Sequence, residues 1–115
     1  MATFTKVQLS GSTNGRGIAV AATATLGTTI HTAHATALDE VWLYANNIHS
    51  SAVVLTVEYG GVTTTSDLIQ QSIGATPSGL VLICAGLLVT GSVVVTAFAD
   101  TANKIELFGF VNRIA

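Results

Sequence analysis

The chain has 115 residues, of which half are hydrophobic and 9% are charged, and its formal net charge at pH 7 is −2. Its four Lys and Arg residues are scattered, which argues against nucleic-acid binding because contacts to several phosphates need clustered cations. The length predicts one domain, residues 1–115. Ordinary soluble domains carry about a quarter of charged residues, so the apolar excess predicts an oligomer or a subunit of an assembly.

The first half of the chain predicts short strands separated by turns. Residues 5–9 alternate polar and apolar side chains, as a half-buried strand does. A glycine-rich loop follows at residues 10–17, where Asn14 and Gly15 favour a tight turn and the glycine spacing does not match a phosphate-binding loop. Residues 32–40 are the helical candidate, but they are too few for a stable helix. Further strands are predicted at residues 17–23, 28–32, 39–45 and 52–59.

The second half contains a long uncharged span, residues 68–99. Its apolar run at residues 80–89 is about half the length that a membrane-spanning helix needs, so a membrane span is not expected. Turn-forming residues and then three valines follow this run, and β-branched side chains fit a sheet better than a helix. The span therefore predicts two core strands at residues 80–85 and 92–98, joined by residues 86–91 with a short extended piece allowed at 87–89. Additional strands are predicted at residues 68–73 and 104–111.

These strand lengths, with turn signals between them, predict an all-β fold. We expect a single-domain antiparallel β-sandwich or a jelly-roll-like barrel of about eight strands. On residues 39–45 the alternation places Trp42 and Tyr44 opposite the aliphatic side chains, and on residues 104–111 it does the same for Phe108 and Phe110. Both faces of these strands therefore carry bulky groups.

No motif in the sequence predicts a catalytic residue. Cys84 lies in the apolar run and is expected to be a small buried hydrophobe, which is compatible with assembly in the cytoplasm. His31 and His34 would point to opposite faces of a strand, so a satisfied or surface role is favoured over a metal site. Asp39 and Glu40 are interpreted as solvated charges at the end of a strand.

Other residues could in principle form a binding site, but their spacing does not indicate one. The remaining acidic side chains show no pattern of an acid–base pair or a Ca²⁺ site, so no cofactor and no metal are predicted. These side chains are Glu58, Asp67, Asp100 and Glu106. Trp42, Tyr44 and Tyr59 could form a sugar-stacking platform, although aromatic residues in alternating strands are more often core or interface. The N-terminus shows no secretion signal.

Segments spread over most of the chain resemble small all-β virion proteins of tailed bacteriophages. These segments are GSTNGRGIAV, TTIHTA, DEVWLYANN, VVLTVEYGG, SGLVLI and ELFGFVNRI. The resemblance is to capsid decoration, or cement, proteins. It implies a homo-oligomer, with a trimer favoured and a dimer allowed, that is assembled in the host cytoplasm. Such a protein binds the major capsid protein on the capsid exterior of the virion and strengthens the shell; no enzymatic activity, nucleic-acid partner or membrane partner is implied.

The expected interface combines an N-terminal arm, which could pair with a neighbouring chain, with the aromatic face of the strands. Its residues are Ala2, Thr3, Phe4, Thr5, Lys6, Trp42, Tyr44, Phe108 and Phe110. Two alternatives stay open: a neck, tail or head-fibre component of a virion, and a carbohydrate-binding β-sandwich module. The three histidines would permit assembly that depends on pH.

Overall fold

Over residues 2–115, the range that the computed structural model describes, the chain forms nine β-strands and no helix. The helical candidate at residues 32–40 forms the end of β3, a connection and the start of β4 instead. None of the described residues lies in a helix that could cross a membrane. The strands are β1 (Phe4–Gln8), β2 (Ile18–Ala19), β3 (Thr28–Thr32), β4 (Leu38–Asn47), β5 (Val53–Tyr59), β6 (Leu68–Ile73), β7 (Val81–Val89), β8 (Val94–Ala99) and β9 (Ile105–Ile114).

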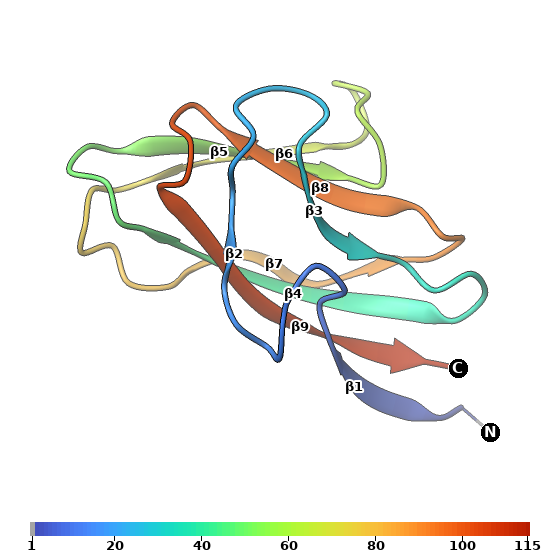
Figure 1. Ribbon diagram of the computed structural model, residues 1–115. Coiled ribbons are helices and arrows are strands. Elements are labelled where there is room, and N and C mark those ends of the chain that lie inside the picture. Colours follow the sequence, from blue (N-terminus) through green and yellow to red (C-terminus); the bar gives the residue numbers. More distant parts are fainter. Residues whose placement is uncertain (1) are drawn as a thin grey trace.

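The strands form two antiparallel sheets that pack as layers (Figure 1). One sheet has the order β1-β9-β4-β7, and β2 continues the edge that β1 forms along β9. The other sheet has the order β3-β8-β5-β6. With β1 and β2 counted as one broken strand, this is the strand order of an eight-stranded jelly roll. The expected all-β sandwich of about eight strands is confirmed.

Alternating side chains explain how the two sheets make one core. β4 and β9 pair over ten positions, from Leu38↔Ile114 to Asn47↔Ile105, and every second residue of each points at the other sheet. Burying these apolar side chains between the layers is the main force that holds the sandwich together. The fully buried aliphatic residues are Leu9, Val20, Ile30, Val41, Leu43, Ala45, Val53, Leu55, Val57, Ile73, Val95, Ala97, Ala99, Ile105, Leu107 and Val111.

The predicted second strand is much shorter than expected because the chain changes sheets there. The backbone N–H of Val20 donates to Ile105 on β9, whereas the carbonyl of Ala22 accepts from Ala99 on β8. The segment thus leaves one layer for the other within three residues. The preceding turn is confirmed: Asn14 and Gly15 both have positive φ angles, 56° and 78°, as the tight-turn dipeptide predicts.

Residues 79–98, which lie within the uncharged span, differ from the prediction of two core strands. β8 is a core strand, but β7 is longer than expected and lies at the edge of its sheet. It continues through Gly86, whose φ angle of 76° accommodates a bulge where the register with β4 shifts. Four leucines on or next to β7 are consequently exposed rather than buried: Leu80, Leu82, Leu87 and Leu88.

Candidate interaction face

Four half-buried aromatic side chains lie together on the outer face of the β1-β9-β4-β7 sheet. Trp42 on β4 is directly opposite Phe110 on β9, and Tyr44 is directly opposite Phe108. Residues opposite each other in neighbouring strands project to the same side, so these form two adjacent cross-strand pairs. We call this surface, with Phe4 and Lys6 from β1, the aromatic face.

Contacts within the aromatic face fix its side chains. The rings of Trp42 and Phe110 are stacked, with centroids 6.0 Å apart and planes 9° apart. Lys6 Nζ lies 4.7 Å from the Phe110 centroid, within the range of a cation–π contact. Phe108 lies against Gly17, where a Cβ atom would be 2.7 Å from the ring. Trp42, Phe108 and Phe110 are thus each packed against a neighbouring residue.

A carboxylate at the edge of this face orients the indole. Glu40 Oε1 accepts hydrogen bonds from Trp42 Nε1, at 2.9 Å, and from Asn112 Nδ2, at 3.1 Å. These two bonds lower the pKa of the Glu40 carboxyl, against a smaller opposing effect of burial. Glu40 therefore stays ionised beside the indole and adds a negative charge to an otherwise largely apolar surface.

The structure also locates the N-terminal residues expected at an interface. β1 pairs with β9 of the same chain, and Thr3 and Ala115 exchange two backbone hydrogen bonds beyond it. Phe4 and Lys6 share the side of the sheet that carries Phe110, and Phe4 is 71% exposed. Thr5 is opposite Arg113 and belongs to the other side, so it lies outside the aromatic face, while Ala2 precedes the paired residues.

The three aromatic residues of the suggested sugar platform do not come together. Tyr59 is on β5 of the other sheet, and its hydroxyl donates a 2.7 Å hydrogen bond to the carbonyl of Leu87. Burial raises the pKa of this phenol, so its proton stays available for the bond. Trp42 and Tyr44 thus stand apart from Tyr59.

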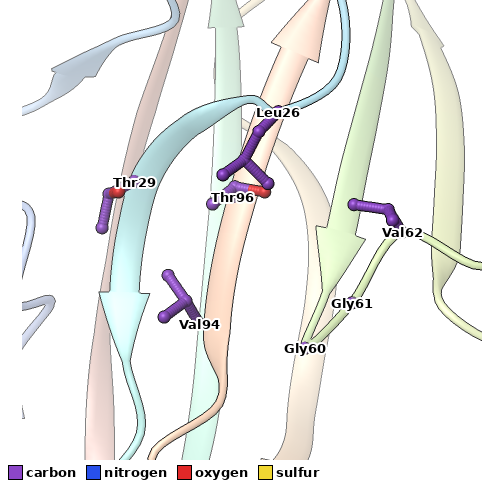
Figure 2. Close-up of a pocket in the computed structure, with 7 residues that line it drawn as sticks. All are labelled: Leu26, Thr29, Gly60, Gly61, Val62, Val94 and Thr96. Carbon is purple, nitrogen blue, oxygen red and sulfur yellow. The ribbon is translucent and has the colours of Figure 1, made fainter.

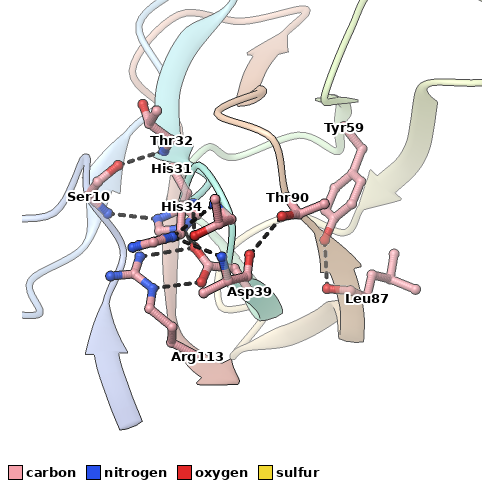
Figure 3. Close-up of polar contacts among 11 residues, drawn as sticks. Ser10, His31, Thr32, His34, Asp39, Tyr59, Leu87, Thr90 and Arg113 are labelled. Carbon is pink, nitrogen blue, oxygen red and sulfur yellow. Dashed lines mark hydrogen bonds and ion pairs between the residues drawn. The ribbon is translucent and has the colours of Figure 1, made fainter. Parts of the chain in front are cut away.

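A polar cluster at one end of the sandwich was not expected from the sequence (Figure 3). Asp39 is fully buried, and Arg113 binds both its oxygens through Nε and a terminal nitrogen, at 2.8 and 3.0 Å. His31 Nε2 lies 2.7 Å from Asp39 Oδ2, and the backbone N–H of His34 also donates to that oxygen. The interpretation of Asp39 as a solvated strand-end charge is wrong, because its side chain points into the sandwich. The expectation that the hydrogen-bonding groups of His31 are satisfied is confirmed.

The cluster sets the ionisation of Asp39. Burial raises the pKa of its carboxyl, but hydrogen bonds from Arg113, His31 and the His34 backbone outweigh burial and bring the pKa to about 2. The backbone N–H of Ser10 donates to His31 Nδ1 at 3.0 Å, so Nε2 is the protonated nitrogen and donates to Asp39. A neutral imidazole and an ionised carboxylate are the states that fit this geometry.

Ser10, His31 and Asp39 resemble the composition of a catalytic triad, but their atoms are arranged differently. In a triad the serine hydroxyl contacts the imidazole that removes its proton. Here the backbone nitrogen of Ser10 makes that contact, and its Oγ accepts a 2.6 Å hydrogen bond from the backbone N–H of Thr32. The three residues join β3 and β4 to the end of β1, which is a structural role.

A second buried carboxylate, Glu58, lies on the outer face of the other sheet. Thr25 and Thr96 donate hydroxyl hydrogen bonds to it, and the backbone N–H of Gly27 donates at 2.8 Å. Burial raises the pKa of Glu58, but these three donors outweigh it and lower the pKa overall. Glu58 thereby fastens the loop before β3 onto the sheet.

A shallow groove of about 310 Å³ lies beside this loop (Figure 2). Its lining is apolar apart from two threonines and consists of Leu26, Thr29, Gly60, Gly61, Val62, Val94 and Thr96. Within residues 2–115 no three His, Cys, Asp or Glu side chains are grouped as metal ligands. Cys84 is buried as expected, and burial raises its pKa to about 11.

Comparison of the chain with protein-family models, with curated proteins and with solved structures gave no match. Two observations are therefore relevant to function: the geometry of the aromatic face and the resemblance of the sequence segments.

Proposed function

We propose that this chain is a capsid decoration protein, a structural subunit that binds the outside of a bacteriophage shell as a homo-oligomer and stabilises it. The observation that carries this proposal is the aromatic face, which brings residues far apart in sequence onto one open sheet surface. Aromatic side chains are enriched where proteins contact one another and supply much of the binding energy. The resemblance to cement proteins supports the choice of partner, the major capsid protein.

The shape of the aromatic face suits a protein surface better than a small ligand. Small-molecule sites are concave and enclose most of the ligand. The aromatic face covers the outer side of a sheet, and the groove of Figure 2 belongs to the opposite sheet. Because Trp42 and Phe110 are already stacked, binding would order few side chains, which reduces the entropic cost of association.

The first test is the copy number of this chain in purified particles, measured by quantitative mass spectrometry against the major capsid protein. A ratio near one, or a fixed simple fraction of one, is expected for a protein that decorates the whole lattice. A handful of copies per particle would move the protein to the neck, tail or a fibre. Absence from the particle would overturn the virion assignment.

The second test asks whether the aromatic face makes the contact. Particles that lack the protein are mixed with purified wild type, with Trp42→Ala or with Phe98→Ala, and bound protein is measured after sedimentation. Loss of a central aromatic anchor costs about 2 kcal/mol or more, so Trp42→Ala should bind at least about 30-fold more weakly. Phe98 is a half-buried aromatic residue on β8 of the other sheet, so Phe98→Ala should bind like wild type. Equal loss with both variants would exclude the aromatic face.

A further inference from the structure

Three of the four edges of this sandwich carry features that prevent pairing with other strands. The outer edge of β3 is covered, because Gly11 donates to the Ile30 carbonyl and Ser10 Oγ accepts from Thr32. The edge formed by β1 and β2 carries Lys6 and is broken into two short pieces. β6 has only six residues and exposes Gln70, Gln71 and Ser72. Charge, short length, polar side chains and covering segments all protect sheet edges in this way.

The β7 edge lacks these features. It is nine residues long, contains no charge and no proline, and lies within the uncharged residues 68–99. Among the described residues, the strand order of its sheet ends at β7. Leu82 is 49% exposed, Leu87 42% and Leu88 55%, and Leu80 just before the strand is 60% exposed. An edge of this kind tends to associate with another protein surface.

Two bulges determine which groups β7 offers. The register with β4 shifts at Gly86 and again at Ile83, so the alternation of side chains is interrupted twice. Beyond the bulge at Gly86, Leu87 pairs with Val41 and Leu88 with Glu40, so these two leucines point to opposite sides of the sheet, and both are exposed at its edge. Bulges discourage a long ladder of main-chain hydrogen bonds along an edge. The exposed leucines, with short stretches of backbone between the bulges, are therefore the groups available for contact.

We propose that β7 is the self-association surface of this protein, and that its partner is β7 of a second copy related by a two-fold axis. In a two-fold contact each patch meets itself, so like charges in the patch would oppose one another. β7 itself has no charge to oppose. Of the charged residues of the aromatic face, Glu40 lies opposite Leu88 on β4, and Lys6 lies on β1 at the other edge of the sheet. A partner that binds through charged side chains would likewise have no opposite charge on β7 to pair with. The inference rests on the self-association in the proposed function. Leu82 and Leu88 lie opposite Tyr44 and Glu40, so the two-fold contact adjoins the aromatic face.

A head-to-tail contact between β7 and the β1 edge of another copy fits less well. Each edge is formed by the last strand of the same sheet, so joining them would continue an antiparallel sheet. However, the edge formed by β1 and β2 is broken into pieces of five and two residues, whereas β7 has nine residues. A second β7 therefore offers a longer partner strand than this edge does.

The experiment is to measure the mass of the purified chain, without any shell, by analytical ultracentrifugation over a range of concentrations. Three forms are compared: wild type, the double variant Leu82→Lys/Leu88→Lys, and Leu26→Lys. Leu26 is a matched control because it is 69% exposed and lies by the groove on the opposite sheet. Wild type and Leu26→Lys should be dimers that dissociate on dilution, and the double variant should be monomeric, with at least a tenfold rise in dissociation constant.

Hydrogen exchange provides a second measurement that does not depend on substitutions. Backbone amides of β7 should exchange more slowly at concentrations where wild type is a dimer than at concentrations where it is a monomer. A monomeric wild type at all concentrations, a trimer, or a dimer unaffected by the double variant would each overturn the proposal. These outcomes concern self-association alone, whereas the copy number in particles and shell binding by Trp42→Ala test the decoration function independently.

Discussion

At the scale of single residues, the buried ion pair of Asp39 is the clearest target for a stability measurement. Asp39→Asn keeps the shape of the side chain but leaves the guanidinium of Arg113 without a counter-charge. Removing one partner of a fully buried pair costs about 3 kcal/mol or more. Because the Arg113 side chain is 26% exposed, the free energy of unfolding in urea should fall by less, about 2 kcal/mol. Asp67→Asn, in a partly exposed loop, should change it by less than about 0.5 kcal/mol. Equal effects would show that Arg113 is adequately hydrated without Asp39.

The same carboxylate predicts an acid-dependent loss of stability. Its pKa is lowered from 3.8 to about 2 in the folded protein, so the folded state holds fewer protons than the unfolded state between these values. The stabilisation is therefore complete above about pH 4 and is lost as pH falls through 2. At 1.36 kcal/mol for each pKa unit, about 2 kcal/mol should disappear over this range. Urea unfolding at pH 5 and pH 2 should show this loss in wild type, and a loss smaller by that amount in Asp39→Asn.

The alternation that predicted the core also contained the signal for this cluster. Asp39 is in phase with Val41 and Leu43 within the strand predicted at residues 39–45, and Arg113 is in phase with Leu107 and Val111. Extending the strand predicted at residues 104–111 by two residues would therefore have placed both charged residues on the core side. Because that predicted strand ended at residue 111, the pairing was missed. His31 could not be placed in this way. A register shift between Thr29 and His31 buries two successive residues of β3, and such a bulge leaves no clear mark in the sequence.

At the scale of elements, the bulge at Gly86 links the β7 edge to the aromatic face. An added Cβ atom would lie 3.2 Å from Trp42 Cζ2, and the positive φ angle would strain any other residue. Gly91 has a similar φ of 71° but no atom within 4 Å of such a Cβ, so Gly91→Ala isolates the backbone strain, about 1 kcal/mol. Gly86→Ala should cost about 1 kcal/mol more by crowding Trp42. Gly86→Ala should also change the fluorescence of this single tryptophan, whereas Gly91→Ala should not. Identical spectra for the two variants would show that a side chain at position 86 does not disturb the indole.

The elements themselves were largely predictable, but their places in the sheets were not. Turn dipeptides and alternation located most strands to within a few residues, because both features depend only on local sequence. Residues 80–85 were expected to form a core strand, yet the strand found there, β7, lies at the edge of its sheet. Hydrophobic composition cannot distinguish an edge from a core strand, since that difference depends on which other strands pair with it. The exposed leucines of β7 are the result.

At the scale of the whole molecule, the jelly roll brings the two ends of the chain into one sheet. β1 and β9 are hydrogen-bonded neighbours, and Thr3 and Ala115 form the outermost pair (Figure 1). Closing this contact requires almost the full length of the chain to form a loop, which is entropically costly and slows folding. Because β1 and β9 are neighbours in one sheet, a short linker can join them without changing the contacts of the folded protein.

A circular permutant should therefore fold to the same structure. Linking Ala115 to Thr3 through Asn-Gly makes a two-residue hairpin loop, the length that the Thr3 and Ala115 hydrogen bonds require, and new ends can be opened in the exposed turn between Asn14 and Gly15. Because the pairing of β1 with β9 becomes local, refolding after dilution from urea should be faster, with the free energy of unfolding within about 1 kcal/mol of the parent.

The permutant also tests the N-terminal arm. If β1 belongs to its own sheet, as its register with β9 indicates, sedimentation should show the same oligomeric state and the same binding to particles as the parent chain. If residues 2–6 instead pair with a neighbouring copy, fastening β1 in a hairpin would prevent that exchange, and assembly would be lost although the permutant folds. Deleting residues 2–6 removes Phe4, Thr5 and Lys6 from β1, so the free energy of unfolding should fall because part of β9 loses its partner. Unchanged assembly and unchanged particle binding in this deletion would show that the arm makes neither contact.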